Sequence, residues 1–479
     1  MTKSRWLRAL VAMFALLVPV SAAHAAATSW TQITPVTEGN TDEVSVARTA
    51  DGTLHVAWTR PTPSPGNDLL ETPIAPSGVV GASVLIASNW ASFLNPAVVT
   101  SSSTGLEVFV GGIHSIAPGD PHVNLSQFSS SDGGATWTLY PSDLTKTGSA
   151  YASDASAALG AGGNPFVTWG SSACLCVHMG LSASTPNADF QQGLGDFGYE
   201  PGIDVDRASG QMVVAWYSNG TGHTGIYADG VNQSTGGPAS APVLMPGTSD
   251  ILAGPYSGRT PIAARAGGGL YVAYSNGYPS HTQLLLWRVG AGASTVLEHG
   301  STEVNSVGLA ADPSGRLWVF WSTTPSDTDT PIVFARRSNP SVTAWGATVA
   351  VKPPAGASTS WNLVGDGQAG RLDLLGSFSL GTSSTAATWA TQVLPGLTLS
   401  SSRSRLHIGG KHATKVTFTV TDAGQPVKGA LVQADGAHGS TNAKGKVSLK
   451  LGPFKHRTSL TAKAGSNGYV RASLKLTVR

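Results

Sequence analysis

One pattern recurs seven times along the chain: a polar residue, a strand-like apolar segment, a glycine turn and a second strand-like segment that mostly ends in an aromatic residue. The copies occupy residues 43–58, 95–110, 154–169, 200–216, 259–274, 305–321 and 361–376. Their starts lie about 45 to 60 residues apart, a period that is typical of propellers and repeat arrays. Four short strands fit in each period, as a propeller blade requires. We therefore predict an all-β chain dominated by a seven-bladed β-propeller.

The composition agrees with many short strands and tight turns. The 479 residues include 58 Gly and 29 Pro, only 12% are charged, and no long amphipathic helical stretch is present. Such a texture favours strands over helices. We expect three segments: a signal peptide at 1–25, the propeller at 26–396 and a smaller β-domain at 397–479.

The first 25 residues have the form of a secretory signal peptide. Lys3, Arg5 and Arg8 precede an apolar run at 9–20, and Ala-His-Ala at 23–25 fits a cleavage site. The run is too short to span a membrane, and no other segment is long and apolar enough. We expect a secreted monomer, extracellular or associated with the cell wall, without a transmembrane span.

The seventh repeat lacks an outer strand. Its third strand, at 386–394, leads directly into the next domain, whereas residues 29–34 resemble an outer strand that has no blade of its own. Joining the two chain ends in one blade would remove an unpaired sheet edge. We predict that the N-terminal strand completes the seventh blade.

Residues 130–137, SSDGGATW, form a turn motif between the third and outer strands of the second repeat. Asp132 can accept hydrogen bonds from its own turn, Gly134 allows a positive φ, and Trp137 can bury its ring. Together with Ser130, this spacing resembles the Asp box, or BNR repeat, of the sialidase-like β-propeller superfamily. In that family the turn lies on the rim, so the resemblance implies a structural role for these residues.

The resemblance also raises the question of sialidase activity. Such enzymes bind a carboxylate with three arginines, because the planar guanidinium forms two parallel hydrogen bonds. Asp42 stands where the first arginine is expected, and the only comparable element is the Arg-Thr-Pro beginning at Arg259. Tyr199 and Glu200 match the family's nucleophile and its partner in type, but strand neighbours face opposite sides. We expect no catalytic residues and keep a divergent sialidase-type glycoside hydrolase as the alternative.

The starts of the inner strands predict a ligand site. In a propeller these starts gather near one mouth of the central channel, and six of the seven repeats place a polar or charged residue there. Such a ring could hold a cation such as calcium, or a sugar-like ligand, and no further cofactor is expected. A wet acidic funnel without a defined ligand is the alternative. The candidates are Asp42, Glu43, Asn95, Asp154, Glu200, Arg259, Asn305 and Trp361.

The only cysteines are Cys174 and Cys176. An exported protein can oxidise them, but residues two apart in a strand lie near the distance limit for a disulfide. A strained local disulfide and two small buried side chains both fit. His178 is the only nearby residue of another metal-ligand type, so we expect no metal site here.

From about residue 397 the sequence alternates regularly between apolar and polar residues. The run from Asp422 to Val432, DAGQPVKGALV, resembles a pattern shared by bacterial immunoglobulin-like and carboxypeptidase-regulatory-like β-sandwiches. The resemblance implies a small immunoglobulin-like sandwich, a type of module that serves as a spacer or stalk.

Charge divides the chain in two. Residues 397–479 contain 14 Lys and Arg and only two acidic residues, Asp422 and Asp435, which gives a net charge of +12. Residues 26–396 contain 12 Lys and Arg and 25 acidic residues, which gives a net charge of −13. A basic module can adhere to anionic wall polymer, lipid or nucleic acid, can dock on its own propeller, or can be merely solvated. Without stacking aromatics, specific nucleic-acid binding is not expected. At 446–451 lysines alternate with apolar residues, which predicts a charged stripe on one face.

The function predicted from these features is recognition of an extracellular glycan or cell-wall polymer without catalysis. The propeller would bind the ligand, and the basic C-terminal domain would adhere to an anionic surface. A sialidase-type hydrolase and a purely structural surface protein are the two alternatives. Three converging arginines at the channel mouth would favour the enzyme, an acidic ring would favour a binder, and an apolar plug would favour a scaffold.

Overall fold

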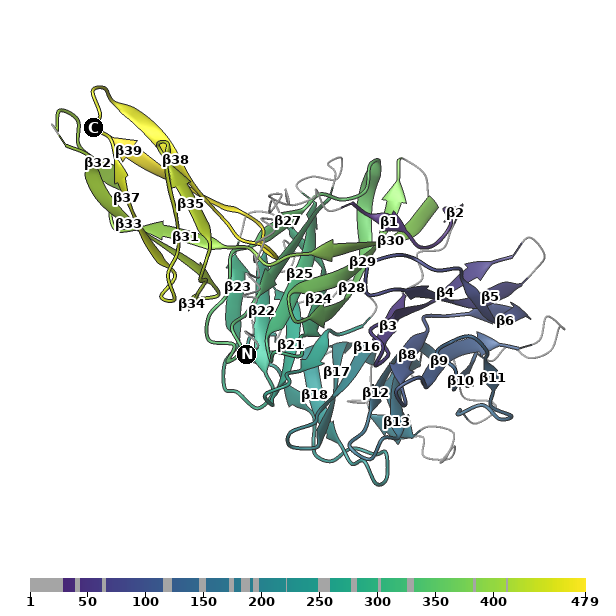
Figure 1. The fold of residues 1–479 in the computed structure, drawn as a ribbon. Helices are drawn as coiled ribbons and strands as arrows, with labels where there is room; N and C mark the ends of the chain where they lie inside the picture. The colour runs from purple at the N-terminus through teal and green to yellow at the C-terminus, as the bar shows by residue number, and fades with distance from the viewer. Residues whose placement is uncertain are drawn as a thin grey trace, which may run out of the picture.

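The computed structural model describes residues 29–38, 44–62, 66–114, 123–145, 152–171, 176–181, 190–192, 198–220, 222–248, 259–276, 282–299, 303–324, 331–381, 385–410 and 412–479. All regular structure in these ranges is β-strand, and no helix occurs among them, which confirms the predicted all-β class (Figure 1). Within the same ranges, accordingly, no helix could cross a membrane.

Residues 31–393 form seven antiparallel sheets of four or five strands in the described part of the chain. The first four sheets follow one another along the sequence. The first comprises β3 (Ser45–Arg48), β4 (Leu54–Pro61), β5 (Asn67–Ile74) and β6 (Val84–Trp90). The second comprises β7 (Ser92–Phe93), β8 (Ala97–Thr100), β9 (Leu106–Ile113), β10 (Asn124–Ser130) and β11 (Thr138–Leu139). The third comprises β12 (Ala152–Leu159), β13 (Pro165–Ser171), β14 (Cys176–Leu181) and β15 (Phe190–Gln192), and the fourth β16 (Gly198–Asp206), β17 (Gln211–Gly220), β18 (His223–Val231) and β19 (Val243–Leu244).

The last three sheets continue this order. The fifth comprises β20 (Ile262–Ala264), β21 (Leu270–Asn276), β22 (Gln283–Arg288) and β23 (Thr295–His299). The sixth comprises β24 (Glu303–Ala311), β25 (Leu317–Thr324), β26 (Ile332–Arg337) and β27 (Val349–Val351). The seventh comprises β28 (Ala357–Gln368), β29 (Arg371–Leu380) and β30 (Thr385–Val393), with β1 (Thr31–Gln32) and β2 (Thr37–Glu38) from the N-terminal end.

The seven sheets close into a ring, as in a propeller. The inner strands β3, β8, β12, β16, β20, β24 and β28 each contact the inner strand of the next sheet, and β28 contacts β3. An apolar cluster lies between each sheet and its neighbour. Aromatic residues at the ends of the second strands fill these clusters; Trp169 and Trp216, for example, are almost fully buried. We call these seven sheets the ring. Contacts between neighbouring sheets stabilise it around its whole circumference.

The N-terminal strand joins the seventh sheet, as predicted. β1 pairs antiparallel with β30, with Thr31 opposite Ala390 and Gln32 opposite Trp389. Ile33 enters the apolar cluster between the seventh and first sheets, and the Trp30 ring meets Phe378 edge-on at 5.1 Å. The two ends of the ring sequence thus meet in one sheet.

Residues 398–478 form two further sheets, called here the C-terminal sheets. One contains β31 (Thr398–Ser401), β33 (Thr414–Asp422), β34 (Gln425–Pro426) and β37 (Lys446–Leu451). The other contains β32 (Arg405–Leu406), β35 (Leu431–Ala434), β36 (Ala437–Ser440), β38 (Thr458–Gly465) and β39 (Ala472–Val478). Both sheets contribute to one apolar core, with Phe418 and Leu476 fully buried.

A buried ion cluster joins the ring to the C-terminal sheets. The Oδ2 atom of Asp422 lies 2.5 Å from an Arg337 nitrogen and 3.3 Å from Nη1 of Arg316. Asp422 and Arg337 are 2% and 4% exposed, so this pair is closed to solvent, whereas Arg316 is 12% exposed at the edge of the cluster. Nearby, Gly396 forms β-bridges both to Ala347 of the ring and to Val470 of the C-terminal sheets.

Candidate channel-mouth site

The inner strands carry a recurring β-bulge at the predicted mouth positions. In the third, fourth, sixth and seventh sheets the register between the first two strands shifts at the bulge. The shifts contain Asp154, Glu200, Asn305 and Trp361. A bulge leaves a residue unpaired and can redirect its side chain, and bulges are common next to active sites. Four of the candidates therefore occupy equivalent positions in the fold.

Asp154 and Glu200 also have left-handed backbone conformations, with φ of 50° and 53°. Such conformations are uncommon for residues with a side chain and cluster at functional sites. Two residues after Glu200, a Cβ on Gly202 would lie only 2.0 Å from the carbonyl oxygen of Thr260. Glycine is therefore required where the fourth and fifth sheets approach each other beside this bulge.

Asn95 and Asp154 lie together, as a common mouth would require. The Asn95 side-chain amide donates a 2.7 Å hydrogen bond to Oδ1 of Asp154, across two sheets. The Ser153 hydroxyl donates to Oδ2 at 3.0 Å. Burial raises the pKa of Asp154, while these hydrogen bonds and the positive charge of Arg259 lower it.

Glu200 is the second carboxyl group at this place. The residue as a whole is half-buried, but its Oε2 atom is inaccessible to solvent and has no hydrogen-bond partner. Burial, and secondarily the negative charge of Asp154, raises the pKa of Glu200 to about 7. A buried acceptor without a partner costs roughly 1–3 kcal/mol, and such a group calls for an explanation.

Arg259 crosses the middle of the ring. Its Nε donates to the carbonyl of Ala155 at 2.7 Å, Nη1 donates to Val44 at 3.4 Å, and Nη2 donates to Pro96. The fifth sheet is thereby tied to backbone near the inner strands of the first, second and third sheets. Arg259 thus acts as a structural cross-link, a role that the sequence pattern did not reveal.

The other predicted mouth residues are only partly placed. Asp42 and Glu43 lie outside the described residues, and the side chain of Trp361 is not among those described. Asn305 is half-buried in its bulge. No group of three or more His, Cys, Asp or Glu side chains suited to a metal occurs within the described part of the chain.

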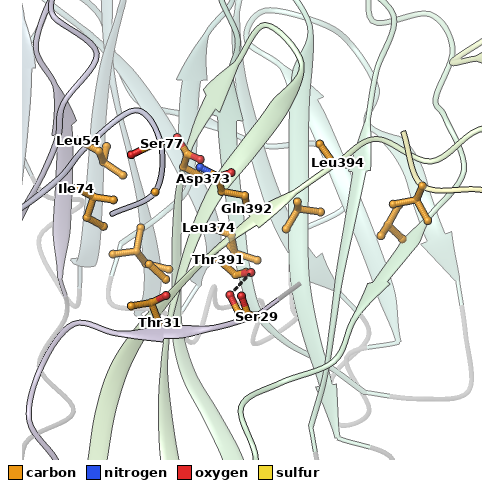
Figure 2. A pocket seen from close by; sticks show the side chains of 16 residues that line it. Ser29, Thr31, Leu54, Ile74, Ser77, Asp373, Leu374, Thr391, Gln392 and Leu394 are labelled. Atoms are coloured by element: carbon orange, nitrogen blue, oxygen red, sulfur yellow. Dashed lines mark hydrogen bonds between the residues drawn. The ribbon is translucent and has the colours of Figure 1, made fainter. Parts of the chain in front are cut away.

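Among the described residues, the ring contains two pockets that a ligand could enter. One of about 210 Å³ lies among inner strands, and its lining includes Arg259, Ile262, Val307 and Leu363. The other, of about 320 Å³, lies between the N-terminal strand, the seventh sheet and the first sheet (Figure 2). Its lining is largely apolar, and its one carboxylate, Asp373, is already paired with arginine. The inner pocket is the one connected to a predicted site residue.

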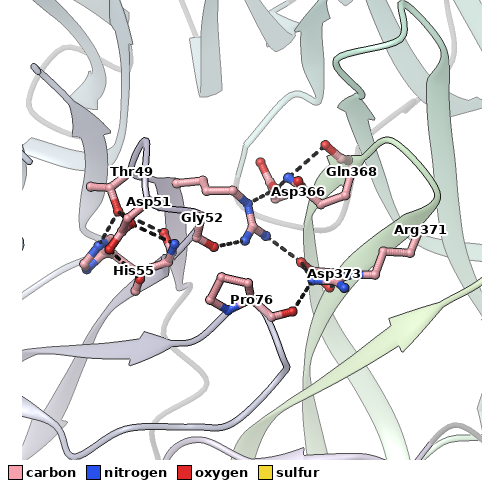
Figure 3. Close-up of polar contacts among 12 residues, drawn as sticks. Thr49, Asp51, Gly52, His55, Pro76, Asp366, Gln368, Arg371 and Asp373 are labelled. Carbon is pink, nitrogen blue, oxygen red and sulfur yellow. Dashed lines mark hydrogen bonds and ion pairs between the residues drawn. The ribbon is translucent and has the colours of Figure 1, made fainter. Parts of the chain in front are cut away.

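Arg48 joins the first sheet to the seventh away from the mouth. Its Nε and Nη2 contact Asp366 and Asp373 at 2.7 and 2.5 Å, and Nη1 donates to the carbonyl of Gly52 (Figure 3). Arg371 also pairs with Asp373, at 2.9 Å. The two ion pairs of Arg48 were missed in the sequence because 318 and 325 residues separate Arg48 from Asp366 and Asp373.

A buried hydrogen-bond chain lies beside this cluster. Thr49 Oγ1 lies 3.0 Å from Nε2 of His55, whose Nδ1 lies 2.8 Å from Glu71 (Figure 3). The order hydroxyl, imidazole, carboxylate is that of a nucleophilic triad. The three residues are only 5%, 2% and 1% exposed, however. No substrate can reach these three side chains in this conformation, so this chain of hydrogen bonds has a structural role.

The arginine trio expected of a sialidase is not assembled by the described residues. Arg265 donates to the carbonyl of Pro340, Arg336 pairs with Glu298, and Arg316 binds Asp422. The register between Tyr199 and Gly202 shifts at a bulge, so the regular alternation assumed for Tyr199 and Glu200 does not hold at this point of the strand.

The turn at 130–137 has the predicted hydrogen bonds. Asp132 accepts from the Thr136 amide at 2.9 Å and from the Thr136 hydroxyl at 2.6 Å, and Ser130 Oγ accepts from the Gly134 amide at 2.9 Å. Gly134 has a φ of 86°, and half-buried Trp137 packs on the cluster between the first two sheets. Asp132 itself is exposed, so its hydrogen bonds are open to solvent.

The cysteine prediction is not settled by these contacts. Cys174 lies outside the described residues, and Cys176 is placed in β14 by its backbone alone. Both the local disulfide and the pair of buried side chains remain predictions.

No protein-family model matches this chain, and no curated protein matches it. Among solved structures, it resembles a protein of unknown function from Dyadobacter fermentans, with 11% identity, a TM-score of 0.46 and coverage of 77% of this chain and 100% of that one. It also resembles the polysaccharide lyase Uly1, with 8% identity, a TM-score of 0.46 and coverage of 78% and 94%. A Trypanosoma rangeli sialidase is similar at 9% identity and a TM-score of 0.40, with coverage of 77% and 60%. At such scores, below 0.5, the likenesses carry no argument about this chain's activity.

Proposed function

We propose that this protein is a secreted, non-catalytic recognition protein that binds an extracellular glycan or cell-wall polymer at the channel mouth. The proposal includes export by a signal peptide at 1–25, a seven-bladed Asp-box propeller at 26–396 and an immunoglobulin-like domain at 397–479. It further includes a monomeric state and a basic C-terminal domain that adheres to an anionic surface.

One observation carries the proposal for the mouth: Glu200 Oε2 is buried without a partner beside Asp154, and both residues sit in bulges with left-handed φ. The fold maintains an unfavourable arrangement at this point. Glu200 as a residue is only half-buried, so a rotation of its side chain would expose Oε2 to the mouth, and a sugar hydroxyl donating to it there would remove the cost of the unpaired acceptor. A cation such as calcium would do so too, because carboxylate oxygens are its preferred ligands.

The test is a glycan and cell-wall binding screen of the chain from residue 26, with Glu200→Gln and Asp154→Asn in parallel. We expect the wild type to bind, with the affinity reduced about tenfold in either variant, the equivalent of roughly 1.4 kcal/mol. Glu107→Gln is the matched control, because Glu107 is also a carboxyl whose pKa burial raises, but it is bonded to Gln127 in the second sheet. Equal losses in all three variants, or unaltered binding in Glu200→Gln, would contradict the proposal.

A glycoside hydrolase is the second candidate, favoured by the Glu200 carboxyl. A carboxyl group with a pKa of about 7 beside a hydrogen-bonded aspartate suits a general acid. Release of a chromophore from aryl glycosides that ceases in Glu200→Gln would establish this activity. Release of sialic acid in particular is not expected, because Arg259 already binds three backbone carbonyls. A chain that neither binds nor cleaves any glycan would leave only the structural role.

A further inference from the structure

The outward face of one C-terminal sheet carries three exposed lysines. Lys415 lies on β33, and Lys446 and Lys450 lie on β37, while the alternate residues Val416 and Leu449 are buried. The predicted stripe at 446–451 is thereby confirmed. The three lysines are exposed in the presence of the ring, so the ring does not cover this face, called here the lysine face.

Two of the lysines oppose each other directly. Lys415 and Lys450 are cross-strand partners in the antiparallel pair β33–β37. Such partners have Cβ atoms roughly 4.5–5.5 Å apart, and like charges there are destabilising. Lys446 lies four residues from Lys450, or about 13 Å along the strand. The face therefore combines a like-charge pair with a third charge at a distance.

No carboxylate of the C-terminal sheets neutralises the lysine face. The only two acidic side chains in residues 397–479 are Asp422 and Asp435. Asp422 is buried against Arg316 and Arg337 of the ring. Asp435 follows β35 of the opposite sheet, and its Oδ2 accepts a 3.0 Å hydrogen bond from the amide of Gly452, just beyond β37. Neither carboxylate forms an ion pair with the three lysines among the described residues, so the face keeps an excess of positive charge that an external anion can match.

The remaining side chains of the face are hydroxyls. Thr417 and Ser448 occupy the row between the lysines and hydrogen bond to each other at 2.9 Å, and Thr419 lies opposite Lys446. None of the strands β31, β33 and β37 places an aromatic ring or a large exposed apolar side chain outward. Base stacking and insertion into a membrane both need such side chains. The face thus suits a polar polyanion better than nucleic acid or lipid.

We propose that the lysine face binds a linear extracellular polymer of phosphate groups. Lysine binds phosphate as a point charge, and hydroxyls donate to phosphate oxygens. Arginine, which recognises single carboxylate or phosphate groups in a bidentate way, is absent from these three strands, so the face suits charge repeated along a polymer better than one anionic group. This inference rests on the adhesive role proposed above for the C-terminal domain and names its partner and its surface.

The test uses the chain from residue 26 and long-chain inorganic polyphosphate as the probe. The variant Lys415→Gln/Lys450→Gln removes the opposed pair. The control Lys463→Gln/Lys475→Gln removes the same charge from the other sheet, where these exposed lysines lie opposite Ser473 and Thr461. We expect the first variant to lose about tenfold in affinity and the control less than about threefold. The slope of log affinity against log salt should fall by roughly 1 to 2 in the first variant.

Equal losses in the two variants would mean that net charge alone governs binding, and no binding by the wild type at low salt would remove the site. Tighter binding to polygalacturonate, single-stranded DNA or anionic vesicles than to polyphosphate would contradict the choice of phosphate. Glycan binding at the channel mouth is scored on the same variants. If the protein binds polyphosphate but no glycan, only the proposed glycan site at the mouth is contradicted. If it binds glycan but no polyphosphate, only the proposed site on the lysine face is contradicted.

Discussion

The ring and the C-terminal sheets carry opposite net charge, yet the signs are exchanged where they meet. The ring sequence, net −13, contributes Arg316 and Arg337 to the junction, and the C-terminal sequence, net +12, contributes Asp422, one of its two acids. General attraction between an acidic and a basic domain therefore does not position them. A buried, hydrogen-bonded cluster does, and it leaves the lysine face open.

The two regions also differ in how they are stabilised. The C-terminal sheets share a single apolar core. The ring has a separate cluster at each of its sheet interfaces, and the interface that closes it needs Ile33 from one end of the ring sequence and Leu375 from the other. Loss of one end should therefore affect the ring much more than the C-terminal sheets.

Removal of residues 26–35 should have the largest effect. β30 would lose its pairing with β1 and keep only the two-residue pairing with β2, and the closing cluster would lose Ile33, for which truncation to Ala alone costs about 2–5 kcal/mol. Calorimetry should show a strongly lowered transition for the ring and an unaltered one for the C-terminal sheets. Unchanged melting of the ring would show that β1 does not close it.

Asp422→Asn should come next, because it separates the two regions. The substitution leaves Arg337 buried without its counter-charge, and breaking a buried pair in this way costs about 3–5 kcal/mol. We expect easier proteolysis between residues 394 and 398, and an earlier loss of the junction in urea. Asp435→Asn is the control, since Asp435 is exposed and its hydrogen bond to the Gly452 amide lies within the C-terminal domain. If both variants behave alike, the ion cluster is not what couples the regions.

Much of the fold could be predicted because it repeats. The seven-fold pattern located the inner strands, the unpaired segment at 29–34 located the closing strand, and alternation located the lysine stripe. Each of these features depends on residues that are close in sequence or on a period.

The site was less predictable, because it depends on bulges and on contacts between distant sheets. The pattern placed Asp154 and Glu200 at equivalent positions, but it could not show that Oε2 of Glu200 lacks a hydrogen-bond partner or that Arg259 is bound to backbone near three other sheets. Asp422 was visible only as a motif residue, because its arginine partners lie 85 and 106 residues away.

The pH dependence of stability should separate the ring from the C-terminal sheets. The folded pKa of Glu200 is raised from 4.5 to about 7, so the folded state favours the protonated form. Stability is therefore unaffected below pH 4.5 and falls as pH rises towards 7, by about 3 kcal/mol in all. Glu200→Gln should flatten this fall in the ring transition alone. If the ring transition of the variant depends on pH as strongly as that of the wild type, Glu200 is not the source of the pH dependence. If calcium restores the stability of the wild type at pH 8 but not that of the variant, a cation bound at Glu200 is supported.

The smallest effect should come from Asp132, in a turn of the second sheet. Its pKa is lowered, so its contribution to stability should depend on pH in the opposite direction to that of Glu200. Hydrogen bonds from Thr136, first from its hydroxyl and then from its amide, lower the pKa of Asp132 to about 2. A lowered pKa means that the carboxylate stabilises the turn above pH 3.8, and that this contribution is lost as pH falls towards 2. Asp132→Asn should thus lower the melting temperature of the ring slightly at pH 5 and hardly at all at pH 2. Glycan binding at the mouth and polyphosphate binding at the lysine face should both be unchanged, because Asp132 lies in a turn of the second sheet, remote in structure from either. Loss of glycan binding in a variant that remains folded would show that this turn belongs to the site and not only to the rim.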